Sequence, residues 1–183
     1  MKISIASDHA GFEMKQLMID YLVSKGHDVM DCGPDSADRC DYPDYAAAGC
    51  APVVSGTVDR GVLVCGTGIG MAIAANKVHG IRAANCINTN FAQLCREHND
   101  ANVITLSGRF VDLSANKEIL GRWSAPILNR FAKEGEKTYY NPLFTPSLNQ
   151  TGTYPDAPDA TLLQAGDRDR QGGFPDTENL NFP

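Results

Sequence analysis

The residues best suited to chemistry in this 183-residue sequence are a cysteine and the glycine-rich turn that follows it. Residues 62–71 read VLVCGTGIGM, which predicts a buried strand, a turn and the start of a helix. Glycines allow the backbone of such a turn to approach a ligand, and amide N–H groups at the start of a helix favour anions. A cysteine at this place, here Cys65, is a residue that can work as a thiolate base.

Three interpretations of this turn compete. It could be a packing turn that binds no ligand. A dinucleotide-binding fingerprint requires a sixth-position glycine and an acid about 20 residues further on, but Met71 and residues 82–90, RAANCINTN, provide neither, and the Gly-Lys-Ser/Thr of a Walker loop is absent. The third interpretation is an oxyanion cradle, in which Cys65 takes a proton alpha to a carbonyl, the turn amides hold the enediolate oxygen, and Thr67 passes a proton between two substrate oxygens.

Composition restricts the partners of the chain. Its net charge is −6 and it has no run of Lys or Arg, so we expect no nucleic acid. No segment approaches the roughly 18 consecutive apolar residues of a membrane span, and the start, MKISIA, does not resemble a secretory segment, so we expect a cytoplasmic protein. The six cysteines form no C-x-x-C pair and have no histidine at zinc-finger spacing, which favours reduced thiols that mostly pack in the core.

Strand-like and helix-like segments alternate along the first 130 or so residues, which predicts an α/β fold: a Rossmann-like, doubly wound sheet of about five parallel strands with flanking helices. We expect strands over residues 2–7, 27–32, 60–65, 81–87 and 103–106, and helices over 12–25, from about 44, 68–77, 90–98 and 112–131. Ligands of such sheets bind at the carboxyl ends of the strands, at a topological switch point. This rule selects Asp8 and His9 after the first strand, the glycine turn after the third, and Arg109 after the fifth.

Five motifs follow one another along the chain. They are ASDHAG at 6–11, DYP at 41–43, CGTGIG at 65–70, AANK at 74–77 with GIR at 80–82, and HNDAN at 98–102. In this combination and order the sequence resembles the ribose-5-phosphate isomerase B and galactose-6-phosphate isomerase family over roughly residues 1–135. The resemblance implies a sugar-phosphate isomerase domain over 1–135, followed by an irregular C-terminal extension over 136–183.

The resemblance also implies a reaction, the interconversion of an aldose and a ketose phosphate through a cis-enediolate without metal or cofactor. By correspondence Cys65 is the base, and Thr67 handles the two substrate oxygens. The backbone that assists Thr67 belongs to Gly66, Gly68, Ile69 and Gly70. A second branch of the family has a glutamate base one position after the last glycine; here that position is Met71, so the chain resembles the cysteine branch.

Further site residues follow from the same resemblance. His98 corresponds to the residue that opens the furanose ring, and Asn99 to one that binds sugar hydroxyls. Asp8, His9 and Tyr42 correspond to residues that line the same pocket, with His9 near the phosphate end. Asp8 could instead only cap the helix after the first strand. Family members are homodimers or homotetramers in which the His-Asn pair reaches the neighbour's site, so we expect shared active sites.

The phosphate end departs from the family pattern. Arg109 corresponds to a phosphate-binding arginine, but the Gly-Gly-Arg-x-x-x-Arg segment after the last helix is replaced by residues 134–141, EGEKTYYN. Lys137 stands for the first arginine and Asn141 for the second. The default substrate is ribose 5-phosphate, and a tetrulose phosphate, a hexose phosphate or an unphosphorylated sugar remain as alternative substrates. A catalytically inactive sugar-binding protein remains as an alternative function.

The C-terminal extension is rich in Pro, Gly, Asn, Thr and Asp, and residues 151–183 carry six acidic and two basic side chains. One interpretation is a disordered or surface-bound tail. The other is a tail that wraps a neighbouring subunit and delivers Arg168 or Arg170 to its site.

Overall fold

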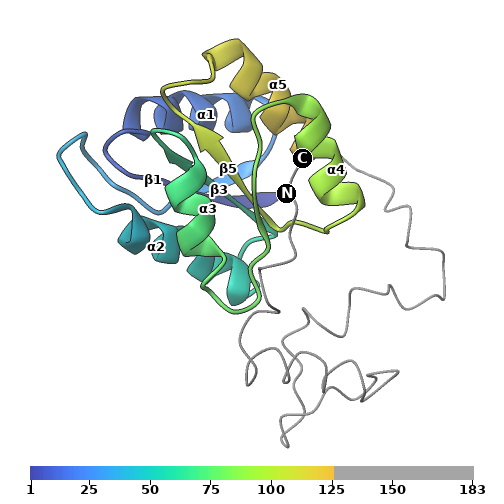
Figure 1. The fold of residues 1–183 in the computed structure, drawn as a ribbon, viewed down its shortest axis with the longest axis horizontal. Coiled ribbons are helices and arrows are strands. Elements are labelled where there is room, and N and C mark those ends of the chain that lie inside the picture. Colours follow the sequence, from blue (N-terminus) through green and yellow to red (C-terminus); the bar gives the residue numbers. More distant parts are fainter. Residues whose placement is uncertain (126–183) are drawn as a thin grey trace, which may run out of the picture. The chain divides into compact units, whose positions relative to one another are not determined.

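Five parallel strands form a single sheet, as the sequence predicts (Figure 1). The computed structural model describes residues 1–125. The strands are β1 (Lys2–Ser7), β2 (Asp28–Asp31), β3 (Arg60–Cys65), β4 (Ala83–Asn85) and β5 (Val103–Ser107). They lie in the order β2-β1-β3-β5-β4, and every neighbouring pair is parallel. Strand β2 lies on one side of β1, and β3, β5 and β4 lie on its other side. The direction of the strand order therefore reverses between β1 and β3, which is the switch point.

Helices cover both faces of the sheet (Figure 1). They are α1 (Phe12–Ser24), α2 (Tyr42–Val54), α3 (Ile69–Ala75), α4 (Thr89–Glu97) and α5 (Leu113–Ser124). Val62 and Val64 of β3 belong to the core formed with α1, α4 and α5, whereas Leu63 and Cys65 belong to the core formed with α2 and α3. Successive residues of a strand point to opposite faces, so the continuous apolar run of β3 reflects burial on both sides.

Several element boundaries differ from the sequence prediction by one or two residues or more, and three of these differences have a clear physical reason. The strand expected over 81–87 is shortened to β4 because it lies at the edge of the sheet and pairs only with β5. Helix α2 begins two residues earlier than expected, with Pro43 in its first turn. Proline is tolerated there because the N–H groups of a first turn have no acceptor within the helix. The helix expected over 112–131 ends at Ser124, because Ala125 has an extended ψ of 150° before the proline at position 126; residues 126–131 lie outside the described part of the chain.

The cysteines are all free thiols, as predicted, and Cys50, Cys65, Cys86 and Cys95 are buried. Burial raises the pKa of the Cys50 thiol to about 12. Most of the cysteines therefore serve as small core residues. None of the helices within residues 1–125 has the length and apolar character needed to cross a membrane.

Candidate active site

The sulfur of Cys65 lies at the carboxyl end of β3, in the middle of the sheet. Cys65 is 5% exposed, and the backbone N–H of Gly68 donates a hydrogen bond to its Sγ at 3.1 Å. Its carbonyl accepts a hydrogen bond from the N–H of Gly108 at 2.8 Å, which fixes the end of the strand. An amide donor aimed at sulfur stabilises a negative charge there, so this geometry suits a thiolate.

The glycine turn is shaped by two close approaches. Gly68 has φ = 81°, in the left-handed region, and a Cβ at this position would lie 2.3 Å from Oδ1 of Asn85. Asn85 is in turn held by the hydroxyl of Thr105, which donates to its Oδ1 at 3.2 Å. A Cβ on Gly70 would lie 3.3 Å from the ring of Tyr42. Glycine at these positions lets β4 and α2 close around the turn.

The amides of the turn divide into two groups. The N–H of Gly68 donates to the Cys65 sulfur, and the N–H of Ile69 donates to Oγ1 of Thr67 at 3.2 Å. Within residues 1–125 the N–H groups of Gly66, Thr67 and Gly70 have no hydrogen-bond partner. These three amides, together with the Thr67 hydroxyl hydrogen, are the donors that the turn offers to a ligand oxygen.

Asp8 and His9 lie at the carboxyl end of β1, across the switch point from Cys65. The N–H of Asp8 donates to the carbonyl of Val64 at 3.1 Å, and Asp8 is 8% exposed. Its Oδ1 accepts the N–H of Gly11 at 2.9 Å, in the turn that precedes α1. Gly11 is itself the N-cap of α1, which has no side-chain cap, so Asp8 does not cap the first helical amides. Nδ1 of His9 lies 3.1 Å from the carbonyl oxygen of Cys40, and this contact ties the imidazole to the loop before α2.

Arg109 and Tyr42 complete the group around the turn. The N–H of Arg109 donates to the carbonyl of Gly66 at 3.2 Å, and Cδ of Arg109 lies 3.6 Å from the position of a Cβ on Gly66. The hydroxyl of Ser107 donates to the same Gly66 carbonyl at 2.8 Å. Arg109 is exposed beyond these contacts, so its guanidinium can bind an anion next to the turn.

His98 and Asn99 are not brought to this group within one chain. Helix α4 returns from the carboxyl end of β4 to the amino end of β5, and His98 is its C-terminal cap. The carbonyl of Asn102 accepts the N–H of Gly61 at the start of β3, whereas Cys65 ends that strand. Four residues of parallel strand span about 13 Å. The predicted pair therefore lies at the opposite end of the sheet from the thiol.

A surface hollow of about 290 Å³ lies along the β4 edge, near Asn99. Its lining residues are Ala84, Asn85, Cys86, Phe91, Leu94, Cys95 and Asn99. Phe91 and Leu94 are 50% and 45% exposed. An apolar surface thus adjoins the predicted sugar-binding Asn99.

Two residues that shape the site are missed by the sequence reasoning. Asn85 supports Gly68, and Ser107 holds the Gly66 carbonyl. Only the strand register places them beside the turn, and neither carries a motif signal of its own. Lys137 lies outside the described residues, as do Arg168 and Arg170. Within residues 1–125 no group of three or more His, Cys, Asp or Glu side chains could hold a metal ion.

The fold and this site define a doubly wound α/β protein that binds a small ligand at its switch point, beside a buried thiol. The sequence model of the family described as Ribose/Galactose Isomerase matches residues 3–138. The chain therefore belongs to the ribose/galactose isomerase family, and the predicted enzyme class, a sugar-phosphate isomerase, is confirmed.

Individual relatives agree with this assignment. Ribose-5-phosphate isomerase B of Escherichia coli (strain K12) is 46% identical over 122 residues, which cover 67% of this chain and 82% of that protein. D-erythrulose-4-phosphate isomerase of Pectobacterium atrosepticum is 44% identical over 124 residues, with the same shares of both chains. The solved structure of Clostridium thermocellum ribose-5-phosphate isomerase B has a TM-score of 0.69 and 44% identity, and it covers 70% of this chain and 87% of that one.

Proposed function

We propose that this enzyme interconverts ribose 5-phosphate and ribulose 5-phosphate through a cis-enediolate, with Cys65 as the base. The observation that carries the proposal is the Cys65 thiol at the switch point, with the Gly68 N–H directed at its sulfur. Support for the substrate comes from relatives that are named ribose-5-phosphate isomerase B. The six free thiols fit a reducing compartment, and we place the reaction in the cytoplasm.

The chemical step uses residues of the glycine turn. The Cys65 thiolate takes the proton from C2 of the open-chain aldose, and the C–H electron pair forms the C1–C2 double bond while negative charge moves to O1. The N–H groups of Gly66 and Thr67 stabilise this oxyanion. The Thr67 hydroxyl relays the O2 proton to O1, and Cys65 returns its proton to C1 as the C2 carbonyl forms.

The remaining residues at this end hold the substrate. Arg109 binds the phosphate through charge-assisted hydrogen bonds, and His9 lies near the same end. Asp8 and Tyr42 line the sugar pocket beside the turn. Lys137 adds a second cation at the phosphate end, by correspondence with the family.

The site is completed by a second copy of the chain. His98 and Asn99 are exposed at the far end of the sheet from Cys65, so they cannot act on the same substrate within one chain. The exposed apolar side chains of Phe91 and Leu94 beside them are suited to burial against a partner. We therefore propose a homodimer in which each active site takes Cys65 from one subunit and His98 with Asn99 from the other.

Subunit complementation tests the shared site. Cys65→Ala and His98→Ala proteins are each expected to be inactive in isomerisation. After mixing and subunit exchange at equal amounts, half of the dimers are hybrids, and each hybrid has one intact site, so about a quarter of wild-type activity should return. No recovery, with hybrids verified by native mass spectrometry, would show that both residues serve the same subunit's site.

The base is tested separately with ribulose 5-phosphate in deuterium oxide. The wild type should incorporate deuterium at C1, and Cys65→Ala should not, although it still binds the sugar. Incorporation by Cys65→Ala at the wild-type rate would refute the assignment of the base.

A four-carbon substrate is the second candidate. It is favoured by the 44% identity to the D-erythrulose-4-phosphate isomerase and by the altered phosphate segment at 134–141. Rates of aldose–ketose conversion for C4, C5 and C6 sugar phosphates and their free sugars decide between them. A kcat/KM for the four-carbon substrate above that for ribose 5-phosphate would replace the first proposal.

A further inference from the structure

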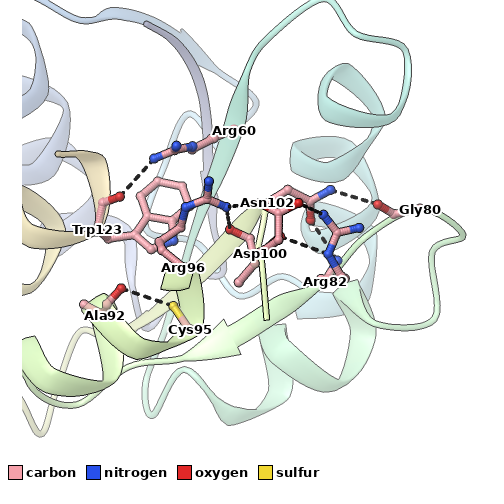
Figure 2. Close-up of polar contacts among 10 residues, drawn as sticks. Arg60, Gly80, Arg82, Ala92, Cys95, Arg96, Asp100, Asn102 and Trp123 are labelled. Atoms are coloured by element: carbon pink, nitrogen blue, oxygen red, sulfur yellow. Dashed lines mark hydrogen bonds and ion pairs between the residues drawn. The ribbon is translucent and has the colours of Figure 1, made fainter. Parts of the chain in front are cut away.

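Two arginines hold the segment that directly follows His98 and Asn99 (Figure 2). Oδ1 of Asp100 accepts a hydrogen bond from Nη1 of Arg96 at 3.0 Å, and its Oδ2 accepts one from Nη2 of Arg82 at 2.8 Å. Arg82 also donates from Nε to the backbone carbonyl of Asp100 at 2.9 Å, and Arg96 donates to the carbonyl of Ala101 at 2.6 Å. We refer to Arg82, Arg96 and Asp100 as the Asp100 clasp.

The backbone inside the clasp has an uncommon conformation. Asp100 has φ = 46°, and within residues 1–125 it is the one non-glycine residue with positive φ. This conformation is unfavourable for most side chains and persists where the surroundings hold it. The side chain of Asn102 contributes by accepting the N–H of Arg82 and donating to the carbonyl of Gly80, both at 2.8 Å. The turn that joins α4 to β5 is thus fixed from several directions.

The charges in this region favour a carboxylate at position 100. Arg60 adjoins Arg96, and its guanidinium lies 5.4 Å from the ring centre of Trp123 and donates to the Trp123 carbonyl at 3.0 Å (Figure 2). Burial, followed by the charge of Arg96, lowers the pKa of Arg60 to about 10. Without the Asp100 carboxylate, Arg82 and Arg96 would repel each other at close range.

We propose that the Asp100 clasp is a positioning device, which holds the turn that presents His98 and Asn99 to the neighbouring subunit's active site. This inference rests on the proposed function above. His98 caps α4 through its N–H bond to the Leu94 carbonyl at 2.8 Å, and the clasp begins two residues later. A small misplacement of a catalytic group costs rate steeply, so an exposed pair that reaches another subunit needs a fixed backbone. The clasp residues act through His98 and touch no substrate.

The chemistry of the two sugars separates this role from general stability. Ribose 5-phosphate closes to a furanose through O4, so its isomerisation requires the ring opening assigned to His98. Ribulose 5-phosphate cannot close to a furanose because its C5 hydroxyl carries the phosphate, so it reaches Cys65 as an open chain. A defect in His98 placement therefore slows conversion of ribose 5-phosphate but spares deuterium exchange at C1 of ribulose 5-phosphate.

The experiment measures both reactions for three Asp100 variants in the full chain. Asp100→Gly permits the left-handed backbone but lacks the carboxylate, and Asp100→Asn keeps one acceptor oxygen and a side chain that tolerates this conformation. Asp100→Ala loses both features. The matched control is Asp59→Ala, because Asp59 directly precedes β3 at the same end of the sheet and accepts one backbone N–H, from Lys2 at 2.8 Å.

If the clasp positions His98, the Asp100 variants should lose conversion of ribose 5-phosphate but keep deuterium exchange at C1 of ribulose 5-phosphate. Asp100→Gly and Asp100→Ala should lower kcat/KM for ribose 5-phosphate by about 10- to 100-fold. Asp100→Asn should lose less, and the exchange rate at saturating ribulose 5-phosphate should stay close to that of the wild type for all variants. His98→Ala should show the same split, and Asp59→Ala should show no loss in either reaction.

Two results would overturn the proposal while leaving the proposed function intact. An Asp100→Gly enzyme that is fully active on ribose 5-phosphate would show that the carboxylate is not required. A parallel fall of both reactions would show a merely structural role. A wild type that performs neither reaction would refute the proposed function itself, and with it the catalytic purpose of the clasp.

Discussion

Gly68 is the position in the turn at which an added methyl group should destabilise the fold most. Its φ of 81° lies in the left-handed region, and a Cβ would meet Oδ1 of Asn85 at 2.3 Å. The backbone conformation alone costs an alanine about 1–2 kcal/mol. Displacing Asn85 breaks its hydrogen bond from Thr105, which adds about 1 kcal/mol. We therefore expect Gly68→Ala to lower the free energy of unfolding by roughly 2–3 kcal/mol.

Gly26 provides the matched control. It has φ = 80°, nearly the same backbone conformation, but a Cβ there would have no neighbour within 4 Å. Gly26→Ala therefore includes the backbone cost and the change in unfolded-chain entropy, without the clash. The difference between the two variants isolates the contact with Asn85, and it should be about 1 kcal/mol or more.

Activity should separate the two variants further. Moving the Gly68 backbone weakens its hydrogen bond to the Cys65 sulfur. A hydrogen bond to a charged group contributes about 1.5–3 kcal/mol, and about 1.4 kcal/mol corresponds to a tenfold rate. With Cys65 as the proposed thiolate base, kcat should therefore fall at least about tenfold in Gly68→Ala. Gly26→Ala should retain kcat. Urea unfolding and ribose 5-phosphate turnover test this; equal stability and equal kcat in the two variants would refute the reasoning.

Three further predictions concern buried polar groups. Lys15 is fully buried and donates to Asp31 at 2.7 Å and to the Pro34 carbonyl at 2.8 Å, so Lys15→Met should lose roughly 1–3 kcal/mol in urea unfolding, with exposed Lys25→Met as a neutral control. Burial, then the N-terminal ammonium and an arginine, lower the pKa of His27 below 6.5. The stability linked to this histidine is therefore present above pH 6.5 and is lost as the pH falls below it. His27→Gln should reduce the difference between the free energies of unfolding measured at pH 7.5 and at pH 5.5. With a pKa of about 12, Cys50 should resist iodoacetamide at pH 8 until the chain unfolds, as read by peptide mass spectrometry.

The central strands and the local order of the site were predictable from sequence. Strands β1 and β3 have the predicted bounds because both are continuous apolar runs buried in the middle of the sheet. The switch-point rule predicts that Asp8, Arg109 and the glycine turn lie together, and backbone hydrogen bonds join both residues to the end of β3 and the turn. Edge strand β4 was predicted too long, because its ends have apolar residues but only one neighbouring strand to pair with.

The contacts that tune the turn were not predictable. Asn85 supports Gly68 through a strand register that places it beside Thr105, and register is a property of the assembled sheet. The use of the Gly68 and Ile69 amides within the turn likewise depends on the local path of the backbone. A sequence motif names the glycines but does not say which N–H groups remain for a ligand.

The topology of the fold explains why the family motif HNDAN is continuous. A helix that joins two parallel strands must return to the end of the sheet at which the next strand begins, so α4 carries His98 away from the thiol of its own chain. We therefore expect a residue at that end of the sheet to take part in this chemistry only by reaching the site of another copy. Presentation requires the turn after the helix to be fixed, and Asp100 and Asn102 fix it. In the proposed dimer, His98 and Asn99 and the residues that hold them are therefore neighbours in sequence, because one turn serves both purposes.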